Sequence, residues 1–338
     1  MSKERLVIIC PGRGSYTRET SNYLVNSNEE FNSFIQWIDE QRKISGRISI
    51  KELDSKPFKM KTHMPGENAS PLIYTSTLND FLSIDKDSYE IVAITGNSMG
   101  WYTALALGGA ISLHDGYHLI QFMGSIMEEG TIGGQIIYPI IDKEWKIDDN
   151  LKNKILFLAQ EMKAYISIYL GGYIVIGGEQ MVLDRLLKKL PKKENYPFQL
   201  PFHAAFHTPL LDLISDKAKK TIHESIFSKP SVPLIDGFGN LWSPFSTDTS
   251  ELYQYTLSDQ ITCPYNFSKA ITVAIKEFCP DKLVLLGPGN TLGGPVGQVF
   301  VQNQWNSIFS KKSFIKTQKK NPYLISMGIN EQRKLISK

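Results

Sequence analysis

The chain has 338 residues, of which 42% are hydrophobic and 21% are charged, and its formal net charge is +3. This apolar content is enough for one α/β core with a small second lobe, and the weak positive charge gives no indication of nucleic-acid binding. No apolar run approaches the ~18 residues of a membrane span, and the start Met-Ser-Lys-Glu-Arg lacks a hydrophobic signal region, so we expect a cytoplasmic protein without a membrane segment.

A short apolar strand is predicted near the N-terminus, over residues 5–10. It runs directly into the sequence Pro11-Gly12-Arg13-Gly14-Ser15. A tight glycine-containing loop at this place can direct several backbone N–H groups at one point, although a lone loop of this kind is usually only a turn.

The most informative segment is residues 89–110. It contains a predicted strand over 89–95, the turn Gly96-Asn97-Ser98-Met99-Gly100, and then a helix of small residues. A Gly-x-Ser-x-Gly turn between a strand and a helix is the context of a nucleophile elbow. The glycines permit the sharp reversal and the strained backbone that expose the serine hydroxyl. We therefore take Ser98 as the candidate nucleophile, because the flanking elements argue against a chance loop.

A serine nucleophile needs a base, and His207 is the best candidate among the six histidines. It lies in Ala-Ala-Phe-His-Thr-Pro-Leu-Leu, where an apolar approach and a following proline place it at the start of a predicted helix. A histidine in such a segment is more often structural, so this assignment depends on the other motifs. The remaining histidines are expected in loops or on polar helix faces; they are His63, His114, His118, His203 and His223.

Further elements are predicted around and beyond this histidine. The middle of the chain has predicted strands over 134–141 and 173–176 and helices over 153–164 and 180–190. Two more strands are predicted over 232–236 and 283–286, and the second leads into Gly-Pro-Gly-Asn-Thr-Leu-Gly-Gly at 287–294.

The three cysteines lack Cys-x-x-Cys spacing, so neither a disulfide framework nor a zinc site is favoured, and we expect no metal. Residues 311–338 carry eight Lys or Arg against one Glu and are expected to be a basic, solvated tail.

Taken together, four motifs resemble the malonyl-CoA:acyl carrier protein transacylase family over about residues 5–300. They are the Pro-Gly-x-Gly-Ser loop, the Gly-x-Ser-x-Gly elbow, the Phe-His-Thr-Pro-Leu-Leu segment and the Gly-Pro-Gly loop. Weaker matches occur at 67–72, expected before a helix, and at 259–264. The resemblance implies an α/β fold: an α/β-hydrolase-like large domain with a parallel sheet and an inserted ferredoxin-like small domain. The expected boundaries are 1–128 and 199–310 for the large domain, 129–198 for the small domain and 311–338 for the tail.

The resemblance also implies a mechanism at the cleft between the lobes. Ser98 attacks an acyl-CoA thioester while His207 takes its proton, and the acyl-serine then passes its acyl group to the phosphopantetheine thiol of an acyl carrier protein. The backbone carbonyl of Gln260 is expected to orient the histidine, and the backbone amides of Met99 and Arg13 to form the oxyanion hole. No bound cofactor is implied, because CoA and the carrier are substrates. We expect a monomer whose partners are acyl-CoA and the carrier protein.

The chain departs from the family pattern at the acyl pocket. Met123 stands where malonyl-specific members have an arginine that grips the substrate carboxylate through two charge-assisted hydrogen bonds. A thioether cannot pair with a carboxylate, so we expect an uncharged acyl group such as acetyl. Asn97 and Trp101 replace a histidine and a glutamate of the family elbow. Tyr169 begins the run that replaces an Asn-Ser-Pro-Gly sequence, and Ser70 is expected at the same pocket.

Three alternatives remain open at this point. Arg13 stands where the family usually has glutamine, so its guanidinium could hold a malonyl carboxylate instead. Some relatives without the pocket arginine are editing hydrolases that clear acyl groups from carrier proteins with the same serine and histidine. A non-catalytic docking protein is disfavoured, because the nucleophile, the base and Gln260 are all retained.

The basic residues over 185–193 are a candidate surface for an acidic carrier, or simply a solvated helix face.

Overall fold

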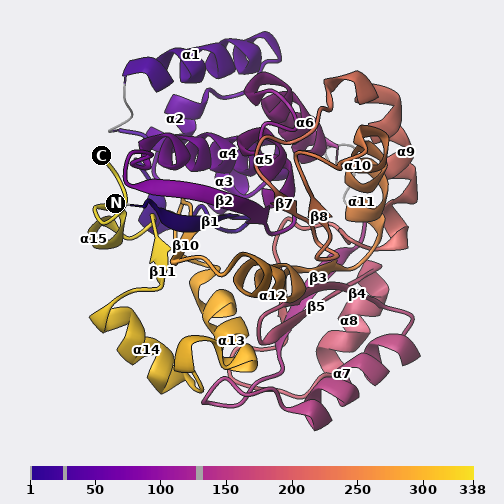
Figure 1. Cartoon of the computed structure of the whole chain (residues 1–338). Helices are drawn as coiled ribbons and strands as arrows, with labels where there is room; N and C mark the ends of the chain where they lie inside the picture. Colours follow the sequence, from indigo (N-terminus) through magenta and orange to yellow (C-terminus); the bar gives the residue numbers. More distant parts are fainter. Residues whose placement is uncertain (1, 26–28, 127–131) are drawn as a thin grey trace.

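Two β-sheets with helices around them organise the chain (Figure 1). The computed structural model describes residues 2–25, 29–126 and 132–338. The larger sheet has the strand order β11-β10-β1-β2-β7-β8, and its neighbours run parallel except for the antiparallel pair β7 and β8. Its strands are β1 (Glu4–Cys10), β2 (Tyr89–Gly96), β7 (Leu234–Ile235), β8 (Leu241–Trp242), β10 (Lys282–Leu285) and β11 (Leu324–Ser326).

The apolar strands form the centre of the large sheet because helices cover both of its faces. In β1, Leu6, Val7, Ile8 and Ile9 are all fully buried, as expected for a parallel strand that reads as a continuous apolar run. Figure 1 shows α4, α5 and α6 on one side, with α1 and α2 beyond them, and α12 and α13 on the other. These helices are α1 (Glu29–Ile44), α2 (Ile50–Ser55), α4 (Gly66–Ser83), α5 (Gly100–Leu107), α6 (Leu113–Ser125), α12 (Phe267–Phe278) and α13 (Gly293–Asn303).

The smaller sheet has the ferredoxin-like topology. In chain order its elements are strand, helix, two strands, helix and strand, and the order β6-β3-β5-β4 is antiparallel throughout, with β9 added in parallel at β4. The elements are β3 (Gly134–Pro139), α7 (Asp149–Glu161), β4 (Tyr165–Leu170), β5 (Tyr173–Gly178), α8 (Gln180–Lys189), β6 (Phe198–Gln199) and β9 (Tyr265–Asn266).

The predicted fold class is confirmed: the protein has a large α/β part with a parallel sheet and a smaller part with its own sheet. Strands β4 and β6 were not predicted from the sequence, because the pattern of a short apolar run does not distinguish a strand from the end of a helix. Residues 67–72 lie inside α4 rather than before a helix. The domain boundaries stay a prediction; residues 129–131 lie outside the described residues.

The expectation of a solvated C-terminal tail over 311–338 was wrong. Strand β11 pairs in parallel with β10 at the edge of the large sheet, and Ile325 and Met327 are fully buried. Only α14 (Lys311–Lys320) has the exposed basic character that the composition suggested. Because its lysines dominate the composition of the segment, the short apolar strand that follows was not predicted. The remaining helices are α3 (Met60–His63), α9 (Asp212–Thr221), α10 (Thr249–Gln254), α11 (Gln260–Thr262) and α15 (Asn330–Arg333).

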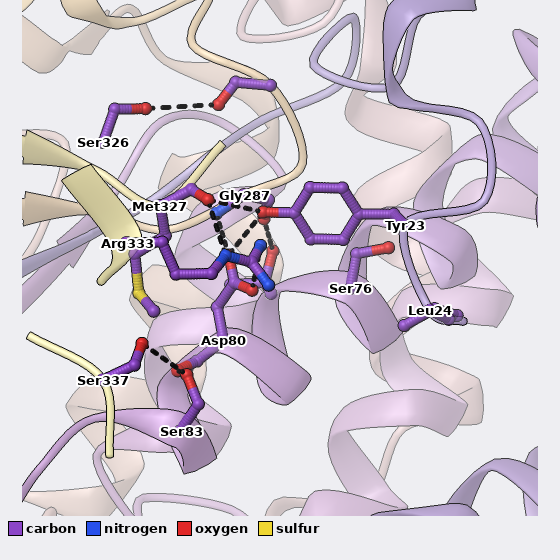
Figure 2. A network of polar contacts seen from close by, with 12 residues as sticks. Tyr23, Leu24, Ser76, Asp80, Ser83, Gly287, Ser326, Met327, Arg333 and Ser337 are labelled. Carbon is purple, nitrogen blue, oxygen red and sulfur yellow. Dashed lines mark hydrogen bonds and ion pairs between the residues drawn. The ribbon is translucent and has the colours of Figure 1, made fainter. Parts of the chain in front are cut away.

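A buried carboxylate joins the C-terminal segment to the core and to the loop after β10 (Figure 2). Asp80 on α4 accepts hydrogen bonds from the Tyr23 hydroxyl and the Gly287 N–H, both at 2.7 Å, and pairs with Arg333 at 2.7 Å. Burial raises the pKa of Asp80 to about 6, and the nearby Arg333 acts in the opposite direction. The network fixes the Gly287 turn, from which the chain continues to residues that line the cavity described below.

No helix within the described ranges is long and apolar enough to cross a membrane.

Candidate active site

The turn after β2 presents Ser98 at the carboxyl end of the large sheet. Ser98 has a φ of +55°, a left-handed conformation that is strained for a serine and typical of a nucleophile elbow. A Cβ at Gly96 would collide with the main chain of Gly100, and a Cβ at Gly100 would collide with the carbonyl of Cys10. The two glycines therefore let the elbow close on itself and lie against the end of β1.

A hydrogen-bonded chain connects Ser98 to His207 and Gln260. The histidine Nδ1 lies 2.6 Å from the backbone oxygen of Gln260, and its Nε2 lies 2.7 Å from Ser98 Oγ. A carbonyl oxygen can only accept, so Nδ1 carries the proton and Nε2 accepts from the serine hydroxyl. The predicted serine, base and orienting carbonyl thus lie together, although more than 100 residues separate Ser98 from His207 in the sequence.

The imidazole of His207 is neutral at physiological pH. Burial lowers the pKa of His207 to about 4, and the hydrogen bond to the Gln260 backbone opposes this shift. A neutral ring with a free lone pair on Nε2 is the form that can take a proton from Ser98.

Gln260 has a second contact that sequence reasoning did not identify. Its side-chain amide donates to the carbonyl oxygen of Ser98 at 3.0 Å and accepts from the Tyr102 hydroxyl at 2.7 Å. The residue therefore holds the histidine through its backbone and the elbow through its side chain. No local pattern in the sequence signals this contact, because Ser98 and Gln260 are 162 residues apart.

Two backbone N–H groups near Ser98 have no acceptor. Within the part of the chain that the structure describes, neither the N–H of Met99 nor that of Arg13 donates a hydrogen bond. Both residues line the same cavity as Ser98, and Met99 precedes the first turn of α5. Unpaired N–H groups at a helix N-terminus can stabilise an anion. The oxyanion hole that the family resemblance implies for these two N–H groups stays a prediction.

A cavity of about 610 Å³ opens beside Ser98 and His207. Strands of the smaller sheet contribute much of its wall, together with residues from the large lobe. Most of the lining is apolar and includes Met64, Ile137, Ile168, Leu170, Val175 and Phe206. Such a lining favours the binding of apolar groups.

Three of the five predicted pocket residues line this cavity, and two do not. Asn97, Ser70 and Met123 are among the lining residues, and so is Arg13, which was expected at the oxyanion hole. The placement of Trp101 at the pocket was wrong: its ring is fully buried, and its Nε1–H donates to Thr256 Oγ1 at 3.1 Å.

The prediction for Tyr169 was also wrong. Tyr169 lines a different depression next to α7, whereas its neighbours Ile168 and Leu170 face the cavity. Successive side chains of a strand point to opposite faces, so a position in β4 one residue off the correct register is directed away from the site.

Arg13 reaches into the cavity from the loop after β1. Its Nη2 donates to the carbonyl oxygens of Met64 at 3.1 Å and Phe202 at 2.5 Å, and the guanidinium lies 5.9 Å from the centre of the Phe206 ring. Burial lowers the pKa of Arg13 to about 10, so the group stays charged at neutral pH. Among the residues described, no carboxylate forms an ion pair with it.

Two further polar residues of the cavity did not emerge from the sequence. His203 was expected in a loop with no role, and Gln135 on β3 was not considered. Both line the cavity, and His203 Nδ1 lies 2.9 Å from Gln135 Oε1. The sequence offers only the spacing of four residues between His203 and His207 as a signal. No group of three or more His, Cys, Asp or Glu side chains suited to a metal ion occurs among the described residues.

Comparison with known proteins gives a consistent result. No protein-family model matches the sequence. The chain is 22% identical over 304 residues to the polyketide biosynthesis malonyl CoA-acyl carrier protein transacylase PksC of Bacillus subtilis, covering 87% of this chain and 96% of that protein. Its fold resembles the crystal structure of a malonyl-CoA:acyl carrier protein transacylase from Xanthomonas oryzae, with a TM-score of 0.73, 17% identity and full coverage of both chains.

A second structure with a similar fold is that of a type II polyketide synthase acyl-carrier protein in complex with its malonyl-transacylase. The TM-score is 0.71 at 17% identity, and 98% of each chain is covered. The resemblance expected from the four sequence motifs is confirmed by these relatives. The chain is similar in sequence and in fold to malonyl-CoA:acyl carrier protein transacylases.

Proposed function

We propose that the protein transfers an acyl group from a CoA thioester to the phosphopantetheine thiol of an acyl carrier protein through an acyl-Ser98 intermediate. The observation that carries this proposal is the chain of hydrogen bonds from Ser98 through His207 to the Gln260 carbonyl, at the edge of a largely apolar cavity. The relatives named above support the reaction class. Detection of an acyl adduct on Ser98, followed by its transfer to a carrier, tests the proposal.

The proposed chemistry has two half-reactions. In the first, the Ser98 Oγ–C bond forms as the hydroxyl proton moves to His207 Nε2. The thioester C–S bond then breaks, and the imidazolium returns its proton to the departing CoA sulfur. In the second, His207 takes the proton of the carrier thiol as its sulfur attacks the acyl carbon; the Oγ–C ester bond then breaks, and the imidazolium returns the proton to Ser98 Oγ. The N–H groups of Met99 and Arg13 bind the oxyanion in both tetrahedral intermediates.

Loading of Ser98 is expected to depend on pH with a midpoint near pH 4, far below the usual value for histidine. Burial depresses the pKa of His207, so its base form persists at pH 5 and above and the rate is flat there. Below the midpoint, protonated Nε2 cannot accept the serine proton, and the rate falls about tenfold per pH unit. The measurement is kcat/KM for acyl-CoA loading from pH 3.5 to 8, with melting temperatures recorded alongside. A midpoint at or above pH 6.5 would contradict this assignment.

For the acyl group, we propose an uncharged chain. Met123 is buried in the cavity wall, where its thioether offers apolar contact and no positive charge. A carboxylate placed there would lose its hydration without an ion pair, which costs several kcal/mol. The apolar lining from the small sheet supports the same choice.

Malonyl transfer with Arg13 in place of the usual arginine is the second candidate. The observation in its favour is a charged guanidinium in the cavity with no carboxylate partner among the described residues. Against it, Nη2 is already engaged by the carbonyls of Met64 and Phe202. Comparing malonyl and acetyl loading in the wild type and in Arg13→Gln separates the two accounts.

The editing hydrolase and the docking protein are distinguished by the fate of the acyl-enzyme. A transferase keeps its acyl-serine until carrier protein is added, whereas a hydrolase loses it to water at the same rate with or without carrier. A docking protein forms no adduct. One time course of adduct decay, with and without a carrier protein, therefore separates all three. We retain a cytoplasmic monomer as part of the proposal, and its mass in solution tests the oligomeric state.

The carrier protein is proposed to dock on basic residues of α8. Lys188 and Lys189 in the last turn are exposed, and Arg185 lies one turn earlier. The nearby Lys192 and Lys193 are partly engaged, since their ammonium groups donate to backbone carbonyls. An acidic carrier would be attracted to this exposed positive charge.

Reversing the charge in Lys188→Glu/Lys189→Glu is expected to slow acyl transfer to carrier about tenfold at low salt, mainly through the association rate. The effect should fade at 1 M salt, where the Debye length is about 3 Å. Loading from acyl-CoA should be nearly unchanged. Lys319→Glu/Lys320→Glu on α14 is the matched control, with the same charge change elsewhere. An unchanged transfer rate would leave α8 as a solvated helix face, and equal losses in both half-reactions would indicate damage to the lobe.

A further inference from the structure

The cavity holds a histidine that the proposed chemistry does not use. His203 lines the cavity together with Ser98 and His207, and it belongs to the loop that leads to the catalytic histidine. Its Nδ1 contacts Gln135 Oε1 at 2.9 Å, and its Nε2 makes no hydrogen bond with any residue that the structure describes. An unpaired polar nitrogen in a mostly apolar wall costs free energy unless a ligand forms a hydrogen bond with it.

A chain of hydrogen bonds fixes which nitrogen of His203 carries the proton. The Ser167 hydroxyl donates to the carbonyl oxygen of Phe206 at 2.8 Å, so its oxygen must accept from Gln135 Nε2 at 2.6 Å. The amide orientation follows, and Gln135 Oε1 can only accept from His203 Nδ1–H. In the neutral ring, Nε2 is then a hydrogen-bond acceptor. Burial and the neighbouring Arg13 and His207 lower the pKa of His203 well below its usual range, so the ring is neutral.

A charged hydrogen-bond donor lines the same cavity as this acceptor. Arg13 Nη2 binds the carbonyl oxygen of Phe202, the residue before His203, while Arg13 Nη1 makes no hydrogen bond within the described residues. The cavity therefore offers both a cationic donor and a neutral acceptor, and the donor residue is hydrogen-bonded to the neighbour of His203. A hydroxyl group can accept from the first and donate to the second. A carboxylate has no proton for the lone pair of Nε2 and would be repelled by it.

We infer that the protein selects acyl groups that carry a hydroxyl, with His203 Nε2 accepting the hydroxyl proton and Arg13 donating to its oxygen. This inference rests on the proposed acyl transfer, and it narrows the uncharged acyl group to a hydroxyacyl group. His203 is then a specificity residue, with no part in the proton transfers at Ser98.

The test compares donors that differ only in the hydroxyl. The wild-type protein is mixed with butyryl-CoA, 3-hydroxybutyryl-CoA or 4-hydroxybutyryl-CoA, and the rate of adduct formation on Ser98 is read by intact mass. We expect the better hydroxylated donor to load about tenfold faster than butyryl-CoA, as one added hydrogen-bonded group can supply. In His203→Phe this ratio should fall to about one. In His203→Gln, whose amide can still accept near the position of Nε2, part of the preference should return.

The control variant is His223→Phe, which changes an exposed histidine outside the cavity and should keep the wild-type ratio. A wild-type ratio near one overturns the inference, and so does a full preference that survives in His203→Phe. A contact between His203 and the pantetheine arm gives that same result, a wild-type ratio near one, because all three donors share CoA. If His203→Phe does not fold, the wild-type ratio and His203→Gln decide. Failure of the proposed function looks different, because no donor then forms an adduct on Ser98 and both proposals fall.

Discussion

Ser98→Ala is expected to abolish acyl-enzyme formation, and His207→Ala to slow it by a factor on the order of 10⁴ or more. The alanine at position 98 has no oxygen to form the ester. Without the imidazole, no described group is hydrogen-bonded to Ser98 Oγ to take its proton. Substrate binding should persist in both variants, because the cavity wall is unchanged. The measurement is single-turnover loading from acyl-CoA, followed by intact mass.

Folding must be separated from chemistry in these variants. Ser250→Ala and His223→Ala are matched controls, since both side chains are exposed and lie outside the cavity. The melting temperatures of the Ser98 and His207 variants should stay close to that of the wild type. Covalent labelling that persists in Ser98→Ala would end the proposed mechanism, as it would require a different nucleophile.

Met123→Arg is expected to move donor preference toward malonyl by about 10- to 100-fold relative to acetyl. A guanidinium at this position could form one or two charge-assisted hydrogen bonds with the malonyl carboxylate, and each factor of ten corresponds to about 1.4 kcal/mol. Met123 lies on α6 with its side chain in the cavity wall and is 5% exposed. The ratio of malonyl to acetyl loading rates is the readout.

Met123→Leu is the control for this substitution, because it keeps the apolar character and approximate volume without adding charge. Its malonyl to acetyl ratio should match the wild type. A buried arginine can also destabilise the fold, so melting temperatures accompany the rates. If the wild type already prefers malonyl and Arg13→Gln removes that preference, Arg13 holds the carboxylate and the uncharged acyl group is the wrong choice.

The features that sequence reasoning predicted well are those set by local pattern. A continuous apolar run marks a parallel strand, and two glycines around Ser98 mark a sharp turn, so β1, β2 and the elbow could be predicted from neighbouring residues alone. Each of the four motifs is itself a short local pattern, and their order along the chain then indicated the resemblance to the transacylase family.

The features that were missed or misplaced depend on contacts between distant segments. Gln135 and His203 meet only because β3 of the smaller sheet packs beside the loop before His207. Leu170 rather than Tyr169 faces the cavity, and the sequence could not decide which face of β4 points inward because β4 itself was not predicted. In the C-terminal segment, the lysines of α14 made the composition predict an exposed tail, although a buried strand follows them.

The central claim is that Ser98 carries the acyl group, and intact-mass analysis tests it most directly. The protein is incubated with a panel of acetyl-, butyryl-, hydroxybutyryl- and malonyl-CoA, and the modified residue is located by peptide mapping. We predict one added acyl mass on the peptide that contains Ser98, strongest for an uncharged donor, absent from Ser98→Ala and discharged by carrier protein. No adduct from any donor, or an adduct on a different residue, would contradict the account.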